Sequence, residues 1–173
     1  DLALYVNYPI TRVSFRRKLM RDATGQTGWK LFKGLFRAAA KRKPTAVRIV
    51  ACQIPIIAVF VAVGRPELYV LLWWLPHQTV WRVINRLRSI AEHGGLMRST
   101  DRRQTTHDVK QGWLSSFWLV PFNIGYHLAH HVDMGVPNWH LPQLQRDLID
   151  AGWVTDDYSY QSYRDLWKAP SSA

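Results

Sequence analysis

Cysteine is almost absent from this 173-residue chain. The single Cys52 excludes an internal disulfide framework and a zinc site built from several cysteines. Acidic residues are also scarce, because 12 Asp and Glu stand against 23 Lys and Arg, giving a net charge of +11. Such a surplus suits nucleic acid, an anionic membrane surface or the cytoplasmic side of a membrane protein. No nucleic-acid-binding motif accompanies the charge, so we expect no nucleic-acid partner.

Acids are fewest at the start of the chain, where residues 1–48 contain only Asp1 and Asp22 beside 12 Lys and Arg. Within this region the stretch GWKLFKGLFRAAAKRK, residues 28–43, separates two kinds of side chain at helical spacing. One face carries Trp29, Phe32, Leu35, Phe36 and Ala39, and the other carries Lys30, Lys33, Arg37 and Lys41. This pattern predicts a basic amphipathic helix at a membrane surface, with packing on a soluble core as the alternative.

Charge is missing altogether from two apolar runs, residues 49–64 and 68–81, which the turn sequence RPE separates. Each run is short for a membrane span, which needs about 17–25 residues, so a buried hairpin of a soluble protein is the alternative. Arg48 and Arg82 flank the outer ends, and the second run carries three Trp. We therefore predict a transmembrane hairpin whose two ends face the cytoplasm.

Histidines are few, yet three of the seven stand within NIGYHLAHHVD, residues 123–133. Positions i, i+3 and i+4 share one face of a helix, so His127, His130 and His131 point the same way if this stretch is helical. Neutral imidazoles gathered in this way can hold a transition metal, while a solvated, histidine-rich helix end is the alternative. His140 lies beyond Pro137 and out of phase with this face.

A further histidine, His93, stands in RSIAEHGG, where two glycines signal the end of a helix. The polar residues 94–112 then predict a surface loop in which His107 is solvated. The apolar stretch 113–124 is too short to cross a bilayer, so we expect it to lie in the interface. His93 could then meet the later histidines on one surface. The role of His77, inside the second apolar run, is left undecided between a functional group and a kink residue.

These motifs together resemble a known family. RSIAEHGG, followed about 34 positions later by NIGYHLAHH and then by VP and LP, is similar to the C-terminal part of membrane fatty acid desaturases. The opening DLALYVNYPITRVSFRRKLMRDATGQTGWK resembles the stretch after the second histidine box of that family. The resemblance implies an integral membrane enzyme whose histidine boxes bind two non-haem iron ions on the cytosolic side. Such an enzyme uses dioxygen and an external electron donor of ferredoxin or cytochrome b5 type to remove two hydrogens from an acyl chain.

The resemblance also assigns residues. His127, His130 and His131 match the last histidine box, and His93 matches the histidine of the EH element. Glu92 and Asn123 occupy neighbouring motif positions, where they would hold ligand imidazoles in one tautomer or serve as ordinary capping or surface residues. Relatives often carry a histidine where this chain has Gln145, so the role of that position is undecided.

The fold class that follows is all-α, a membrane helical protein with one transmembrane hairpin, interfacial amphipathic helices and a cytosolic histidine-box cap. All 173 residues would form the C-terminal part of a desaturase domain. Its parts are a basic interfacial segment (1–45), the hairpin (46–84), the metal-binding cap (85–166) and a tail (167–173). The chain begins with Asp1, and only His77 precedes His93, so the resemblance implies that the family's earlier histidine boxes lie in an N-terminal half not included here. This piece would then be inactive alone.

Three rival functions are weighed against a desaturase. A diiron hydroxylase or ketolase acting on a carotenoid or another lipid would use the same ligands. A zinc hydrolase is weaker, because HLAHH contains no Glu to act as a general base. A non-enzymatic basic protein that binds membrane surfaces would explain the charge but not the clustered histidines. Acyl carrier, double-bond position, electron donor and oligomeric state cannot be inferred from the sequence.

Overall fold

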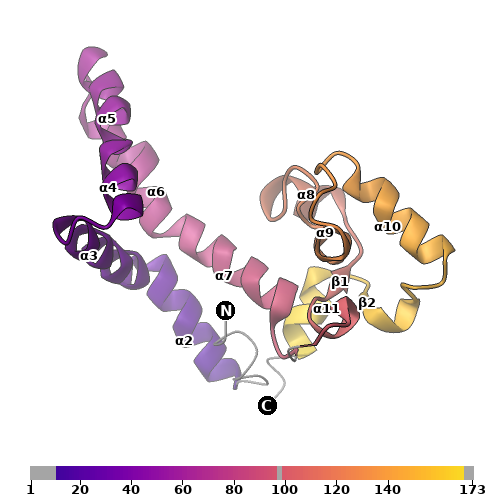
Figure 1. Ribbon diagram of the computed structural model, residues 1–173. Coiled ribbons are helices and arrows are strands. Elements are labelled where there is room, and N and C mark those ends of the chain that lie inside the picture. The colour runs from indigo at the N-terminus through magenta and orange to yellow at the C-terminus, as the bar shows by residue number, and fades with distance from the viewer. Residues whose placement is uncertain (1–10, 97–98, 170–173) are drawn as a thin grey trace. The chain divides into compact units, whose positions relative to one another are not determined.

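The computed structural model describes residues 11–96 and 99–169, and these residues are mostly helical (Figure 1). The chain divides into two compact units, one formed by Arg16–Asn85 and one that contains the residues from Arg86 onward. The division falls within helix α7 (Val80–His93), one residue from the predicted boundary between hairpin and cap. Each unit is described by itself.

The unit Arg16–Asn85 is built from helices that approach one another closely. They are most of α2 (Arg12–Ala23), α3 (Gln26–Ala40), α4 (Pro44–Ala51), α5 (Gln53–Ala62), the π-helix η1 (Tyr69–Trp74), α6 (Leu75–Gln78) and the start of α7. Gly28 lets α3 meet α6, since a Cβ there would lie 2.4 Å from the carbonyl oxygen of Gln78. Phe32 on α3 packs edge-on against Trp74, with ring centroids 5.6 Å apart. Trp29 and Phe36 on α3 stay about half exposed, so the membrane contact of this helix is still a prediction.

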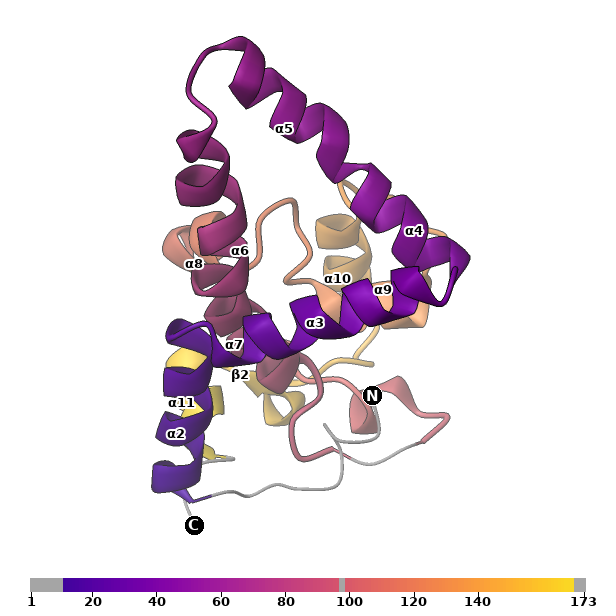
Figure 2. The ribbon, with the colours of Figure 1, turned by 90° about the vertical axis from the view of Figure 1, so that its left-hand side faces the viewer.

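The apolar hairpin forms around a sharp turn. Gly64 has φ +75°, its N–H donates to the Val61 carbonyl, and the Arg65 N–H donates to the Phe60 carbonyl. This is the Schellman pattern, in which a glycine accepts the left-handed conformation after the last helical turn. Figure 2 shows α5 rising to this turn and the chain returning through η1 and α6. Gln53 joins the two arms, because its Oε1 accepts hydrogen bonds from the Tyr69 hydroxyl at 3.2 Å and from Trp73 Nε1 at 3.1 Å.

The two arms differ in regularity. α4 and α5 run on as one stretch, Pro44–Ala62, whose 19 residues are long and apolar enough to cross a membrane and are almost wholly exposed. Among the described residues no other helix meets that test. The returning arm contains π-helical turns and then a break at Thr79, where φ is −119° and ψ is −84°. One predicted membrane span is therefore supported, and the second stays a prediction.

The unit from Arg86 onward is less purely helical than expected. After the end of α7 come η2 (Arg102–Gln104), β1 (Asp108–Val109), α8 (Trp113–Trp118), α9 (His127–Val132), α10 (Leu141–Asp150), η3 (Asp156–Tyr158), β2 (Ser159–Tyr160) and α11 (Tyr163–Lys168). β1 and β2 pair in parallel, with Asp108 opposite Ser159 and Val109 opposite Tyr160. The all-α prediction is thus correct in the main and wrong at this pair. Two residues per strand are too few for an alternating pattern to show in the sequence.

A small core holds this second unit together. Ala91, Val109, Val120, Tyr163 and Leu166 are buried against one another. Trp167 packs on the same cluster and its Nε1 donates to the Leu87 carbonyl at 3.0 Å, so α11 continues past the predicted start of the tail at residue 167. The core therefore ties α11 and β1 to the last turns of α7, the turns that carry His93.

Candidate metal centre

The first histidine of the centre is placed by the end of α7. A Cβ at Gly94 would lie 2.6 Å from the Ile90 carbonyl oxygen, and Gly95 has φ +81°. Both positions therefore require glycine, and the helix ends at His93, as the sequence RSIAEHGG predicts. The imidazole of His93 is left half-buried at the last turn of the helix.

The second and third histidines come from α9, which is shorter than the sequence pattern indicates. Only His127–Val132 is helical, and Leu128 and Ala129 on its inner face are buried. His127 and His131 stand one turn apart on this helix, so their side chains reach the same point in space. Burial of the Leu128–Ala129 face thus directs both imidazoles towards His93.

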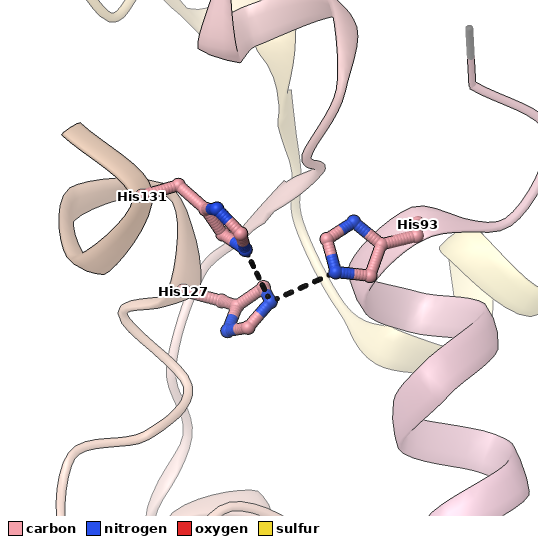
Figure 3. Close-up of side chains that lie close together, drawn as sticks. All are labelled: His93, His127 and His131. Carbon is pink, nitrogen blue, oxygen red and sulfur yellow. Dashed lines mark hydrogen bonds between the residues drawn. The ribbon is translucent and has the colours of Figure 1, made fainter. Parts of the chain in front are cut away.

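Three imidazole nitrogens converge in Figure 3. His127 Nε2 lies 3.1 Å from His93 Nε2 and 3.1 Å from His131 Nε2. The ligand atoms of the three residues all lie within 4.8 Å of one another. Imidazole nitrogens bind a metal such as zinc at about 2.0–2.1 Å, so two of them on one ion lie about 2.8–3.4 Å apart for angles between octahedral and tetrahedral. The distances from His127 Nε2 to His93 Nε2 and to His131 Nε2 match that spacing.

The tautomer of His93 is set by a backbone carbonyl. His93 Nδ1 lies 2.8 Å from the Thr105 carbonyl oxygen, and because a carbonyl can only accept, Nδ1 must carry the proton. In the neutral ring Nε2 is then left with a lone pair, and it is Nε2 that faces the other two histidines. A ligand histidine commonly binds metal through one nitrogen while the other donates to a carbonyl in this way.

Burial favours the neutral form of His127 and His131. Desolvation, followed by the neighbouring His131, His93 and His130, lowers the pKa of His127 to about 2. Desolvation also lowers the pKa of His131 to about 4, with smaller contributions from His93, His130 and Arg102. The Nε2 atom of His127 can carry one proton at most, so it cannot form a full hydrogen bond to both of its neighbours. One cation bound by three lone pairs would satisfy all three rings, so these residues fit a metal ion.

Glu92 lies beside the cluster and is not a solvated surface residue. Its Oε1 accepts from Arg88 Nε at 3.0 Å and from Arg88 Nη2 at 2.6 Å. Its Oε2 lies 3.9 Å from His127 Nε2. The carboxylate therefore stands on the ligating side of the His127 ring rather than behind it. From there the carboxylate can approach an ion bound by His127 Nε2. That Glu92 holds a ligand imidazole in one tautomer stays a prediction.

Two other predicted site residues are not gathered into the group of three ligands. The His130 ring centroid lies 6.0 Å from that of His127 and 5.8 Å from that of His131, so His130 adjoins the cluster without contributing a nitrogen to it. Asn123 has φ +62° and accepts a backbone hydrogen bond from Tyr126 N, but within residues 11–96 and 99–169 its side chain bonds no histidine. The ligand role of His130 and the orienting role of Asn123 stay predictions.

His107 corrects the expectation of a solvated loop. Its Nε2 donates to the Gly94 carbonyl at 2.8 Å, its backbone N–H donates to the Glu92 carbonyl at 3.0 Å, and burial lowers its pKa. The solvated assignment is wrong because carbonyls at a helix C-terminus need donors, and His107 supplies two of them. Thr105 and Thr106 beside it are also buried, so this part of the predicted surface loop packs against the end of α7.

The loop that carries Thr105 is fastened by a residue that the sequence analysis did not single out. The guanidinium of Arg103 lies 5.1 Å from the Trp153 ring centroid and 5.2 Å from that of Tyr158. Arg103 Nη2 also donates to Asp101 Oδ2 at 2.9 Å. Cation–π contacts of this kind hold the loop against the segment that follows α10. No local pattern reveals this function, because the partners are about 50 residues apart in the chain.

Gln145, whose role the sequence left undecided, is buried and joins α10 to β1. Its Nε2 donates to Asp108 Oδ1 at 3.0 Å, while Ser159 Oγ donates to Asp108 Oδ2. Burial raises the pKa of Asp108, and these hydrogen bonds partly oppose that shift. The structure thus gives Gln145 a contact within the scaffold and none with the three clustered histidines.

Acidification should destabilise the metal-free protein. The pKa values of His127 and His131 in the folded state, about 2 and about 4, lie below the value of about 6.5 for an unfolded chain. Their contribution to stability is present above pH ~6.5 and is lost as the pH falls, because the unfolded chain then binds protons that the folded one does not. At pH ~5 protonation of the unfolded chain at His127 should lower the free energy of unfolding by about 2 kcal/mol. The contribution of His131 should be smaller, because solvent screens this more exposed ring. Thermal unfolding followed by circular dichroism at pH 7 and pH 5 measures this, and His127→Gln should reduce the difference. Equal melting temperatures at the two pH values would contradict it.

Comparison with known proteins connects this geometry to a family. The family model described as "Fatty acid desaturase" matches residues 3–166. A protein named "Dihydrorhizobitoxine desaturase", from Bradyrhizobium elkanii, is 31% identical over 103 residues, which cover 58% of this chain and 29% of that protein. The matched part therefore spans less than a third of that relative. No solved structure matches the chain.

Proposed function

Because this chain belongs to the fatty acid desaturase family, we propose that it is part of a membrane oxidoreductase that introduces a double bond into an acyl chain. The proposal includes two non-haem iron ions and dioxygen as co-substrate. The observation that carries it is the convergence of His93, His127 and His131, whose ligand atoms lie within 4.8 Å of one another. Imidazole ligation of this kind suits iron, although it also suits zinc, copper and nickel.

The chain's own residues would divide the work of holding metal. His93, His127 and His131 would bind one iron through Nε2, and the Thr105 carbonyl would keep His93 in the binding tautomer. His130 is proposed as a ligand of the second iron, and Glu92 and Asn123 as residues that orient the ligands. The bound irons supply the redox chemistry that breaks an unactivated C–H bond, which acid–base side chains cannot do.

The partners follow from the electron balance of desaturation. Forming one C=C bond removes two hydrogens and two electrons from the substrate, whereas reducing dioxygen to two water molecules consumes four electrons and four protons. An external donor of ferredoxin or cytochrome b5 type must therefore deliver the other two electrons. The lipid substrate would meet apolar surface on this chain. A groove of about 630 Å³ in the Arg16–Asn85 unit is lined by side chains such as Phe36, Ile54 and Trp73.

Rival functions are separated by their products. The B. elkanii relative is named for dihydrorhizobitoxine, so a substrate other than an acyl lipid is a second candidate. A hydroxylase or ketolase acting on a carotenoid or another lipid would use the same ligands and yield oxygenated products. The histidine cluster disfavours a non-enzymatic membrane binder, which has no need of three half-buried imidazoles that converge on one point.

The metal centre and both ends of the chain are proposed to face the cytoplasm. The basic residues stand mostly before Arg48 and after Trp81, whereas the turn between the apolar runs carries Arg65 alone. Positive flanks resist translocation, so the turn should lie on the opposite side from both ends. Labelling an Arg65→Cys variant and a Ser172→Cys variant in intact membranes checks this, each combined with Cys52→Ser. Equal labelling from the cytoplasmic side would contradict the orientation.

The experiment that tests the activity uses the longest natural polypeptide containing these residues, expressed in a host with a competent electron donor. We expect new unsaturated fatty acids in the lipid profile and none from a His131→Ala variant produced at the same level. A His140→Ala variant is the matched control, because His140 is exposed and stands outside the cluster. An unchanged product profile in the His131→Ala variant would refute the proposal, and hydroxylated or ketonic products would favour the rival.

A further inference from the structure

His77 lies on the returning arm of the apolar hairpin, and the bend of that arm does not explain it. The arm bends through its backbone, because η1 is π-helical, Pro76 stands in the first turn of α6, and the helix breaks at Thr79. Thr79 Oγ1 donates to the Leu75 carbonyl at 2.8 Å across this break. The bend therefore needs no histidine, and His77 is left for another role.

The neighbouring Gln78 determines which ring nitrogen of His77 carries the proton. Gln78 is buried, and a Cβ added at Gly28 would lie 2.7 Å from its Oε1. The Gly28 Cα–H points in that direction, so an oxygen fits there as a weak acceptor, whereas an NH₂ group would not. Gln78 Nε2 is then the atom that lies 3.1 Å from His77 Nδ1. Because an amide nitrogen can only donate, Nδ1 accepts and the neutral ring carries its proton on Nε2.

The Nε2–H of His77 is an unused donor at the apolar groove of the same unit. His77 is exposed and lines this groove of about 630 Å³. In the part of the chain that the structure describes, no group accepts from His77 Nε2. Elsewhere in the groove the Tyr69 hydroxyl and Trp73 Nε1 both donate to Gln53 Oε1, so those donors are already satisfied. An N–H that lacks a partner in apolar surroundings is costly, so a ligand that brings an acceptor to His77 is favoured.

The lining of the groove indicates the chemistry of that ligand. Side chains such as Phe36, Ile54 and Ile57 suit a hydrocarbon chain. No charged side chain among the described residues lines the groove, which disfavours a carboxylate or a phosphate. Trp74, three residues before His77, also lines it, and its Nε1–H has no hydrogen-bond partner among the described residues either. The two free donors therefore suit an uncharged acceptor such as a carbonyl oxygen, which has two lone pairs.

We propose that His77 holds the carbonyl oxygen of an acyl ester or thioester through its Nε2–H while the hydrocarbon chain lies in the groove. The inference rests on the proposed function for the identification of this ligand as the substrate. It assigns to His77 the recognition of the link between the acyl chain and its carrier. A free fatty acid should bind more weakly, because its carboxylate would lose hydration without gaining a cation. A plain hydrocarbon should also bind more weakly, because it offers no acceptor.

The test measures ligand binding to the detergent-solubilised 173-residue chain, so it needs neither metal nor turnover. The probe is a fatty acid methyl ester with a diazirine on its hydrocarbon chain, which is cross-linked by light and located by mass spectrometry. We expect cross-links at groove residues such as Ile54 and Trp73. An unlabelled methyl ester should compete about 3- to 10-fold better than an alkane of equal length, which is the effect of one hydrogen bond.

Variants at residue 77 make the result specific. His77→Phe should abolish the preference for the ester, because phenylalanine keeps the apolar contact and has no donor. His77→Gln should retain the preference, because its amide supplies an N–H. His140→Phe is the matched control and should change nothing, since His140 is also exposed and does not line the groove. Circular dichroism of each variant checks that the helices are kept.

Three outcomes would overturn the proposal. They are cross-links that avoid the groove, an undiminished ester preference in the His77→Phe variant, and loss of that preference in vesicles of phosphatidylcholine. The last result would show that bilayer lipids fill the groove. A chain that keeps the ester preference and the effect of His77→Phe but binds no metal would support the inference and refute the proposed metal centre, so the two failures are distinguishable.

Discussion

Replacing His127 with alanine is expected to abolish metal binding at the histidine cluster. His127 Nε2 is the central atom, 3.1 Å from His93 Nε2 and 3.1 Å from His131 Nε2, so its loss leaves two imidazoles facing a gap. Losing even a residue that only orients a ligand weakens metal binding by about 10–100-fold, so losing the central ligand should cost at least about 100-fold. Titration of the detergent-solubilised chain with Co²⁺, followed by absorption spectroscopy and metal analysis, measures the affinity without any turnover.

Matched variants make this result specific. His93→Ala and His131→Ala should weaken Co²⁺ binding by a similar factor, because each supplies one of the three ligand atoms. His140→Ala should leave the affinity unchanged, since that residue is exposed and lies outside the group of three. His130→Ala should leave the first ion in place, because His130 contributes no nitrogen to the group. Undiminished Co²⁺ affinity in the His127→Ala variant would show that the cluster is not a metal site.

The parts of this centre that sequence could predict are those encoded locally. The spacing of His127 and His131 is one helical turn. The glycines after His93 end a helix because glycine adopts the left-handed backbone conformation at little cost. The structure shows both features. His130 obeys the same helical rule but sits apart from the three ligand atoms, because the burial of Leu128 and Ala129 sets the rotation of α9. Helical periodicity identifies the face of α9 that carries the histidines, whereas packing of the helix determines which of those histidines reach the cluster.

The parts that sequence could not predict depend on long-range contacts. The Thr105 carbonyl that fixes the His93 tautomer is a backbone group, which any residue type would offer. His107 is predicted to be solvated because its neighbours are polar, yet it donates to the carbonyls of Glu92 and Gly94 at the end of α7. The β1–β2 pair joins segments 51 residues apart with two residues per strand. Each of these contacts joins groups that are distant in the sequence, so no local sequence pattern predicts it.

Residues 1–173 expressed alone are expected to produce no unsaturated fatty acids. The proposed reaction needs two iron ions, and even a catalytic zinc ion normally has three protein ligands. The cluster holds three imidazoles, His130 adds a fourth nearby, and His107 is engaged with the Gly94 carbonyl. Four histidines shared between two irons leave about two each, so the second iron would be held mainly by water. We therefore expect further ligands to come from polypeptide other than these 173 residues.

This expectation is measured by profiling the fatty acids of a host with a competent electron donor that expresses residues 1–173. Metal analysis of the purified chain should give at most one tightly bound iron per chain. The longest natural polypeptide that contains these residues, expressed at the same level in the same host, is the positive control. New unsaturated products from residues 1–173, with two irons per chain, would show that the ligand set is complete within this sequence. That result would mean that residues other than the four histidines named above hold the second iron.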